Sequence, residues 1–166
     1  MDIRVDLPGF AQLQAMLQQA PDIANQEFRA FLLGAVSHLQ GEVQQRTPTA
    51  HGSLRGSIIS SVQSMPDGIG VEGVVGTSLA YALPVELGTK PHMPPIEPLV
   101  DWAMQKFGLD EKAARKAAFG IAYRIAQRGT IGYGMFNRTY AANKANLERQ
   151  AGATVQRIAA RMAGAS

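Results

Sequence analysis

The stretch PDIANQEFRAFLLGAVSHLQGEVQQRTP, residues 21–48, decides the architecture of this chain. Its apolar residues recur every three or four positions, the spacing of one buried stripe along a helix: Ala24, Phe28, Phe31, Ala35, Leu39 and Val43. Pro21 suits a first helical turn, and Pro48 disfavours helical geometry at the preceding residue. The pattern therefore predicts one long helix over 22–46.

The segment after this helix changes to residues typical of strands. SIISSVQS (57–64) and GVEGVVGT (70–77) are rich in β-branched side chains, and MPDG (65–68) between them carries turn residues. We predict an antiparallel hairpin over 56–77 that turns at 66–68. It should pack on the long helix through Phe28, Phe31, Leu39 and Val43.

The next stretch, YALPVELG (81–88), fits two structures. Its alternation of apolar residues predicts an edge strand with its proline on the open edge, which another strand or subunit could cover. Leu79, Leu83 and Leu87 also fit the spacing of a helical turn, so that reading stays open.

The remaining segments favour helices. Phe10, Leu13 and Leu17 predict a short helix over about 8–19. IEPLVDWAMQKF (96–107) should end at Gly108, and a further helix capped by Asp110 should end at Gly129. A last helix over about 140–162 has a stripe at steps of three and four, formed by Leu147, Ala151, Val155, Ile158 and Met162.

The fold class is therefore predicted as α+β. A small antiparallel sheet, made of the hairpin plus the edge strand, packs on the long N-terminal helix, followed by a helical insertion and a C-terminal helix. The 166 residues suffice for one ordinary core, so 1–166 is expected to be a single domain. Within it, 1–20 carries the first helix and 91–135 a proline-rich segment with the helical insertion.

Composition excludes several classes of protein. The absence of cysteine excludes disulfides and thiolate metal sites, and a net charge of +3 is weaker than a nucleic-acid binder usually concentrates. Acidic residues occupy the N-terminal positions where a secretory signal would have its basic region. No run of apolar residues approaches the roughly 18 residues needed to span a bilayer. We expect neither a cleaved signal nor a membrane partner.

No pattern of residues predicts catalysis, a metal site or a cofactor. The three histidines, His38, His51 and His92, lack metal-ligand spacing, and Ser53 and Ser57 lie in no nucleophile elbow. Glu86 has no second acidic residue with which it could perform general acid–base catalysis. The glycine-rich RGTIGYG (128–134) follows a helix and lacks the lysine of a phosphate loop, so we interpret it as an interaction loop.

One alternative function remains open for residues 99–128. Lys112, Lys116, Arg124 and Arg128 are spaced in multiples of four, so a helix-turn-helix here could place them on DNA phosphates. A solvated basic face is the ordinary interpretation of such spacing. The second helix also lacks base-reading residues at its start.

Several motifs follow one another along the chain: TPTAHGSLRGSI (47–58) is followed by the hairpin, by YALPVELGT (81–89) and by a proline-rich segment. This succession resembles the tail-completion or neck proteins of long-tailed phages, which include relatives of the lambda minor tail protein Z. The continuations HMPPIEPLVDWAMQKFGL (92–109) and AFGIAYRIAQRGTIGYGMF (118–136) resemble a longer subgroup. The matching residues are Thr47, Pro48, Gly52, Leu54, Arg55, Ser57, Ile58, Tyr81, Ala82, Val85, Glu86, Gly88 and Thr89.

The resemblance implies a structural virion protein, not an enzyme, that forms a ring at the head-proximal end of the tail. A hexamer is favoured, with neighbouring tail and neck proteins as partners, no small-molecule substrate, and at most non-specific contact with genome DNA. Segments 88–98 and 128–137 are expected to be contact surfaces, and Glu86 to pair with Arg55 or to be an ordinary surface charge. The expected interface residues are Arg55, Glu86, Gly88, Thr89, Pro91, Met93, Pro94, Pro95, Ile96, Arg128, Gly129, Thr130, Met135 and Phe136.

Overall fold

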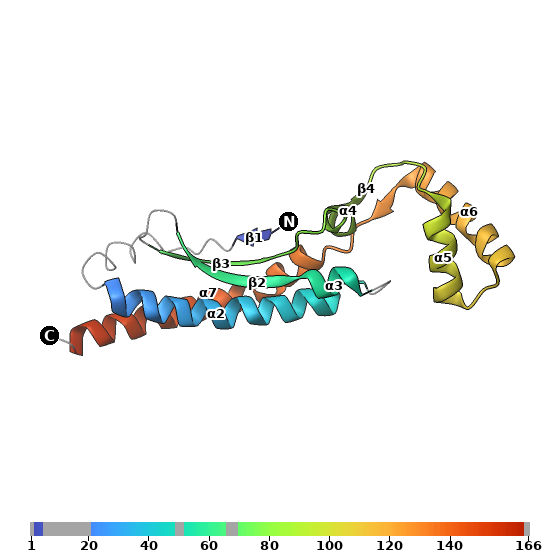
Figure 1. The fold of residues 1–166 in the computed structure, drawn as a ribbon. Coiled ribbons are helices and arrows are strands. Elements are labelled where there is room, and N and C mark those ends of the chain that lie inside the picture. Colours follow the sequence, from blue (N-terminus) through green and yellow to red (C-terminus); the bar gives the residue numbers. More distant parts are fainter. Residues whose placement is uncertain (1, 5–20, 49–51, 66–69, 165–166) are drawn as a thin grey trace.

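The computed structural model describes residues 2–4, 21–48, 52–65 and 70–164. They form a long body from which two helices project at one end (Figure 1). The elements in chain order are β1 (Asp2–Arg4), α2 (Pro21–Arg46), α3 (Ser53–Ser57), β2 (Ile59–Ser64), β3 (Val71–Gly76), α4 (Ala82–Leu87), β4 (Gly88–Thr89), α5 (Ile96–Phe107), α6 (Glu111–Arg128), β5 (Thr130–Ile131) and α7 (Met135–Gly164).

The body is built on two long helices that lie side by side, α2 and α7 (Figure 1). The predicted helix 22–46 is confirmed, because α2 ends at Arg46. Its apolar stripe is buried at Ala24, Phe28, Ala35, Leu39 and Val43. The C-terminal helix begins five residues earlier than its apolar stripe indicated, at Met135.

The predicted hairpin is confirmed as β2 and β3, but it begins later than the predicted residue 56, because Gly56 and Ser57 belong to the short helix α3. The two strands are antiparallel, with Ile59 opposite Gly76 and Ser64 opposite Val71. Their buried residues and neighbouring Ile58 pack on α2, since Val75 and Ile58 share a cluster with Leu39 and Val43. The expected turn at 66–68 lies outside the described residues.

A second cluster continues the core toward the other end of the body. Phe28 and Val71 meet Ile158 of α7 there, and the half-buried Phe31 touches both clusters. The core is thus one layer between α2, α7 and the sheet. This confirms the α+β class, although Phe31 is less buried than its place in the stripe indicated.

At 81–87 the edge-strand prediction is wrong and the helical turn that was left open is confirmed, because Ala82–Leu87 form the short helix α4. Ala82 and Glu86 are buried on one side of it while Leu83 and Leu87 are exposed on the other, which is a helical period. The edge of the sheet is instead β1, which pairs antiparallel with β3 to give the order β1-β3-β2. The predicted helix over 8–19 lies outside the described residues.

The projecting part, which we call the arm, comprises α5 and α6 (residues 96–128). Both predicted helices are confirmed: Gly108 ends α5 in a left-handed conformation (φ 64°), and the Ala113 amide donates to Asp110 Oδ1 (2.7 Å) at the start of α6. The arm has its own small core, formed by Val100, Ala103, Ala114 and Ala118.

Ion pairs join the start of α2 to the end of α7. Glu27 accepts hydrogen bonds from Arg161 (2.6 Å) and Arg157 (3.4 Å). The hydrogen bond from Arg161 holds the pKa of Glu27 below its ordinary value, against the opposing effect of partial burial.

Replacing Phe28 by alanine should lower the free energy of unfolding by about 3–5 kcal/mol, because a buried ring would leave a cavity. Urea denaturation of the purified protein measures this loss. Leu33→Ala is the matched control on α2, since Leu33 is exposed and should change stability by less than about 1 kcal/mol. Equal losses in the two variants would contradict the assigned core.

Glu27→Gln should lower the melting temperature at pH 7 and have no effect at low pH. A carboxyl whose pKa is lowered by folding stabilises the folded state above its unfolded pKa of about 4.3, and this stabilisation is lost as the pH falls through the folded pKa. Thermal scans between pH 7 and pH 3 measure the difference. Glu148→Gln, which removes a long 3.9 Å surface pair with Lys144, should show almost no such dependence.

Candidate functional site

The two segments predicted as contact surfaces lie side by side where the arm joins the body. β4 and β5 form a two-stranded antiparallel ribbon, with Gly88 opposite Ile131 and Thr89 opposite Thr130. The Thr89 and Thr130 hydroxyls are 3.0 Å apart, and the His92 amide donates to the Ile125 carbonyl (3.4 Å). We call residues 88–95 and 129–134 the stalk.

Two glycines allow the strands of the stalk to approach closely. Gly88 and Gly129 both have positive φ (78° and 69°), which favours glycine. A Cβ added at Gly88 would lie 2.1 Å from the Thr130 carbonyl oxygen, and one at Gly129 would lie 1.9 Å from that of Thr89. The glycines of the Gly-Thr motif are therefore required by backbone packing, a reason that the sequence alone did not indicate.

Glu86 is the residue that ties the stalk to the body. It is buried, and its carboxylate accepts hydrogen bonds from the Phe136 amide to Oε2 (3.0 Å) and the Asn137 amide to Oε1 (2.9 Å). These amides belong to the first turn of α7, where helical N–H groups lack partners within the helix and the helix dipole favours negative charge. Glu86 of α4 thus caps α7.

Backbone hydrogen bonds reinforce this cap. The Tyr133 amide donates to the Val85 carbonyl (2.8 Å) and the Gly134 amide to the Glu86 carbonyl (3.0 Å). α4 and the start of α7 are therefore joined by four hydrogen bonds within a few residues. We call this arrangement the Glu86 junction.

The Glu86 junction corrects the expectation for Met135 and Phe136. Both were predicted to lie on a contact surface, yet both are fully buried and belong to the body core. They begin α7, and the cap turns this first helical turn toward α2, where the Thr47 hydroxyl lies 3.3 Å from Met135 Sδ. The outer surface of the 128–137 segment therefore consists of residues before Met135 together with Asn137, which is exposed.

The predicted pairing of Glu86 with Arg55 within the chain is not formed, nor is Glu86 a surface charge. Arg55 is exposed on α3, whereas both carboxylate oxygens of Glu86 bind amides of α7. Arg55 and Arg128 stay accessible to solvent.

The proline-rich segment is exposed apart from its end at the arm. Pro91, Met93 and Pro95 are exposed, and Pro94 is half-buried. Ile96 begins α5 and packs partly against the core of the arm, so it is less exposed than predicted.

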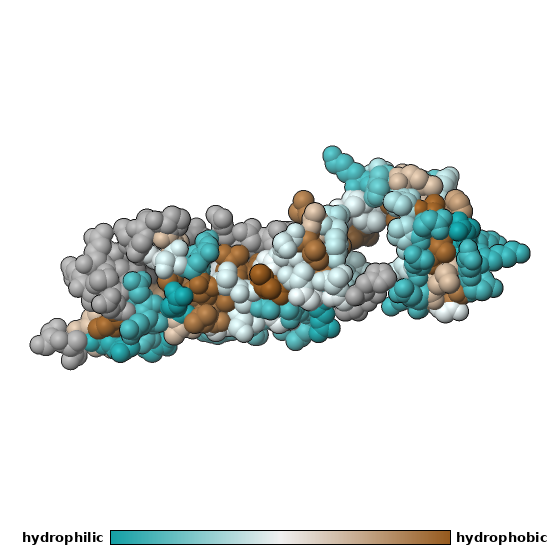
Figure 2. All heavy atoms as spheres, viewed as in Figure 1, coloured by the Kyte–Doolittle hydropathy of each residue, from teal (hydrophilic) through white to brown (hydrophobic). Residues whose placement is uncertain are grey.

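Large apolar side chains that face solvent gather on the arm, the stalk and α4. Among the described residues, two of them, Leu33 and Ile59, belong to α2 and β2 of the body. Ile131 of the stalk is 92% exposed and Leu87 of α4 is 68% exposed. Brown, apolar residues are visible on the arm and near its joint with the body, and also along the body itself (Figure 2). The full set in this region is Tyr81, Leu83, Leu87, Met93, Met104, Phe107, Phe119, Tyr123, Ile131 and Tyr133.

Groups able to carry chemistry are dispersed. Within the described ranges, no three His, Cys, Asp or Glu residues gather as a metal site would require. His38 Nε2 lies 3.0 Å from Asn143 Oδ1 and so joins α2 to α7, while His92 Nδ1 contacts the Lys90 carbonyl. His51 lies outside the described residues. Over the same part of the chain, no helix combines the length and apolarity needed to cross a bilayer.

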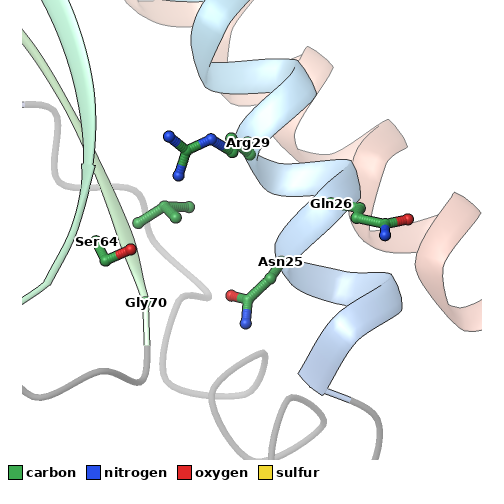
Figure 3. A pocket seen from close by; sticks show the side chains of 6 residues that line it. Asn25, Gln26, Arg29, Ser64 and Gly70 are labelled. Atoms are coloured by element: carbon green, nitrogen blue, oxygen red, sulfur yellow. The ribbon is translucent and has the colours of Figure 1, made fainter.

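One surface hollow of about 180 Å³ lies between α2 and the ends of β2 and β3. Asn25 and Arg29 extend from α2 toward the strand ends, while Gln26 points away (Figure 3). Its volume is below the roughly 300 Å³ at which small-molecule pockets begin. Its geometry thus gives little support to a ligand site.

Comparison with known proteins gave no match to any family model, curated protein or solved structure.

Replacing Glu86 by alanine should lower the free energy of unfolding by about 2–4 kcal/mol, because the buried amide of Phe136 and the partly buried amide of Asn137 lose a charged acceptor. Urea denaturation measures this effect. Glu97→Ala is the matched control: Glu97 binds Arg115 instead of backbone amides, and it does so on the surface, so its loss should be below about 1 kcal/mol. A Glu86→Ala protein as stable as Glu97→Ala would refute the structural role of the cap.

Proposed function

We propose that this chain is a structural protein of a long-tailed phage virion, and not an enzyme. It would complete the head-proximal end of the tail and take part in head–tail joining as a ring of identical copies, with a hexamer favoured. Its other partners would be the neighbouring tail and neck proteins. Genome DNA would meet it at most non-specifically.

The observation that carries this proposal is the distribution of exposed apolar surface. Ten of the twelve large hydrophobic side chains exposed in the described part of the chain lie between residues 81 and 133. An isolated chain leaves them in water, at roughly 25 cal/mol for each Å² of apolar surface that a partner could cover. A ring buries such a region once in every copy through one repeated contact.

The motif that resembles tail-completion proteins supports the same proposal. Glu86 caps α7, while Gly88 and Thr89 form the stalk, so this motif specifies how the arm is attached. A rigid attachment suits ring formation, because a closed ring needs the same angle between neighbouring copies at every contact.

The proposal is tested with the double variant Leu87→Ser/Ile131→Ser. Both side chains face solvent, so the variant should fold like the wild type but form rings at least about tenfold less readily. Native mass spectrometry and electron microscopy of the purified chain, alone and mixed with tail components, measure ring formation. Ile59→Ser is the matched control, because Ile59 is 65% exposed but lies on β2 of the body.

A ring that survives the double variant unchanged would contradict the assigned surface. A chain that forms no ring, alone or with tail components, would contradict the proposed function. If the chain instead bound duplex DNA with a steep dependence on salt, the DNA-binding alternative for residues 99–128 would be favoured.

A further inference from the structure

The outer surface of α6 carries a stripe of two lysines followed by two aromatic residues. Lys112, Lys116, Phe119 and Tyr123 are spaced at i, i+4, i+7 and i+11, so they lie along one side of the helix. All four are exposed, with Phe119 at 52% and Tyr123 at 64%. We call these residues the α6 stripe.

The α6 stripe faces away from the core of the arm. The opposite side of α6 buries Ala114, Ala118 and Ala122, the first two against α5. α6 lies on the side of the arm farthest from the body (Figure 1). A partner could therefore reach the stripe without disturbing either core.

The lysines of the stripe are free to contact a partner. In the part of the chain that the structure describes, neither Lys112 nor Lys116 forms an ion pair, whereas neighbouring Arg115 is held by Glu97 (2.9 Å) and Glu111 (3.6 Å). The lysines and rings lie on one surface, yet no aromatic contact within the described chain covers Phe119 or Tyr123. Among the described residues, the lysines of the stripe thus lack an ion-pair partner and its rings lack an aromatic partner.

The order of the residues makes the stripe complementary to itself. The two lysines are four residues apart, and so are the two aromatic residues. When a second α6 lies antiparallel across a two-fold axis, Lys112 comes opposite Tyr123 and Lys116 opposite Phe119, in one register. The axis generates each pair twice, as in any isologous contact.

The chemistry of these pairs is favourable. A lysine ammonium over the face of Phe or Tyr is attracted by the ring quadrupole, and its alkyl stem covers apolar surface while the charge stays near water. Gly120 lies beside the stripe, and a Cβ there would meet nothing within 4 Å, so no described residue obstructs a second helix at this point.

We propose that two copies of this chain associate through the α6 stripe, as an antiparallel helix pair held by reciprocal lysine–aromatic contacts. The contact does not rest on the proposed ring. Phe119 and Tyr123 belong to the same exposed region between residues 81 and 133, but the ring is assigned to the part of it around Leu87 of α4 and Ile131 of the stalk. The α6 contact covers Phe119 and Tyr123 while the chain is free in solution, and it gives a two-fold dimer, not a ring of more than two copies.

Sedimentation velocity of the full chain over a range of concentrations tests this proposal. The wild type should show a monomer–dimer equilibrium. Phe119→Ala and Lys116→Glu should each raise the dimer dissociation constant at least tenfold, because each removes two symmetry-related contacts. Lys116→Arg should keep the dimer, since guanidinium groups also stack on aromatic rings. Circular dichroism confirms that each variant is folded.

Arg124→Glu is the matched control, because Arg124 is exposed on α6 but lies off the stripe. It changes the charge as Lys116→Glu does and should leave the dimer intact. A chain that stays monomeric at every concentration, or a dimer that Arg124→Glu weakens as much as Lys116→Glu, would overturn the proposal.

Cysteine cross-linking tests the register, since the natural chain has no cysteine. Lys116→Cys protein mixed with Phe119→Cys protein should form the mixed disulfide faster than either protein forms its own. In the mixed dimer the two cysteines lie opposite each other, and the symmetry-related Lys116–Phe119 contact is kept. Homodimeric disulfides that form as fast as the mixed one would exclude the antiparallel register. Loss of rings in Leu87→Ser/Ile131→Ser with this dimer retained would separate the two surfaces.

Discussion

The carboxylate of Glu86 on the first amides of α7 is the constraint on which the rest of the structure depends. It comes from a six-residue helix that is too short to be stable alone, and it fixes where the 30-residue α7 begins. Because Met135 and Phe136 belong to this first turn, the cap also places them in the core beside α2. A helix that started at another residue would bring different side chains against α2. The packing of the body and the position of the arm therefore both depend on this cap.

The chain divides its apolar residues unequally between the body and the arm. The body buries large side chains such as Leu39, Ile58 and Phe136, whereas the core of the arm consists mainly of alanines with Val100. Alanine brings two helices close together but removes little apolar area from water. Leu99, Trp102 and Leu109 are only partly buried against this core, and Met104, Phe107, Phe119 and Tyr123 face solvent, where a second molecule can cover them. Small residues thus form the core of the arm, while different, larger residues form its surface for association.

Charges follow a similar division. In the body, Glu27 binds Arg157 and Arg161 and so joins α2 to α7. On the arm, Arg115 is paired, but the lysines of the α6 stripe point into solvent beside exposed rings. The paired charges of the body stabilise contacts within the chain. The unpaired lysines beside the aromatic residues of the arm are free to contact a second molecule. The proposed ring and the proposed dimer use different parts of this outer surface.

The sequence by itself determined the elements whose signals are local. The period of the apolar stripe identified α2, β-branched residues around a turn identified the hairpin, and Asp110 and Gly108 marked the helix ends of the arm, because caps and periodicity act over a few residues. Only the tertiary structure decided between strand and helix at 82–87, since both periods fit so short a segment. It alone decided the roles of Glu86 and of Gly88 and Gly129, because their partners are about 40 to 50 positions away in the chain and contacts of that range leave no periodic signal.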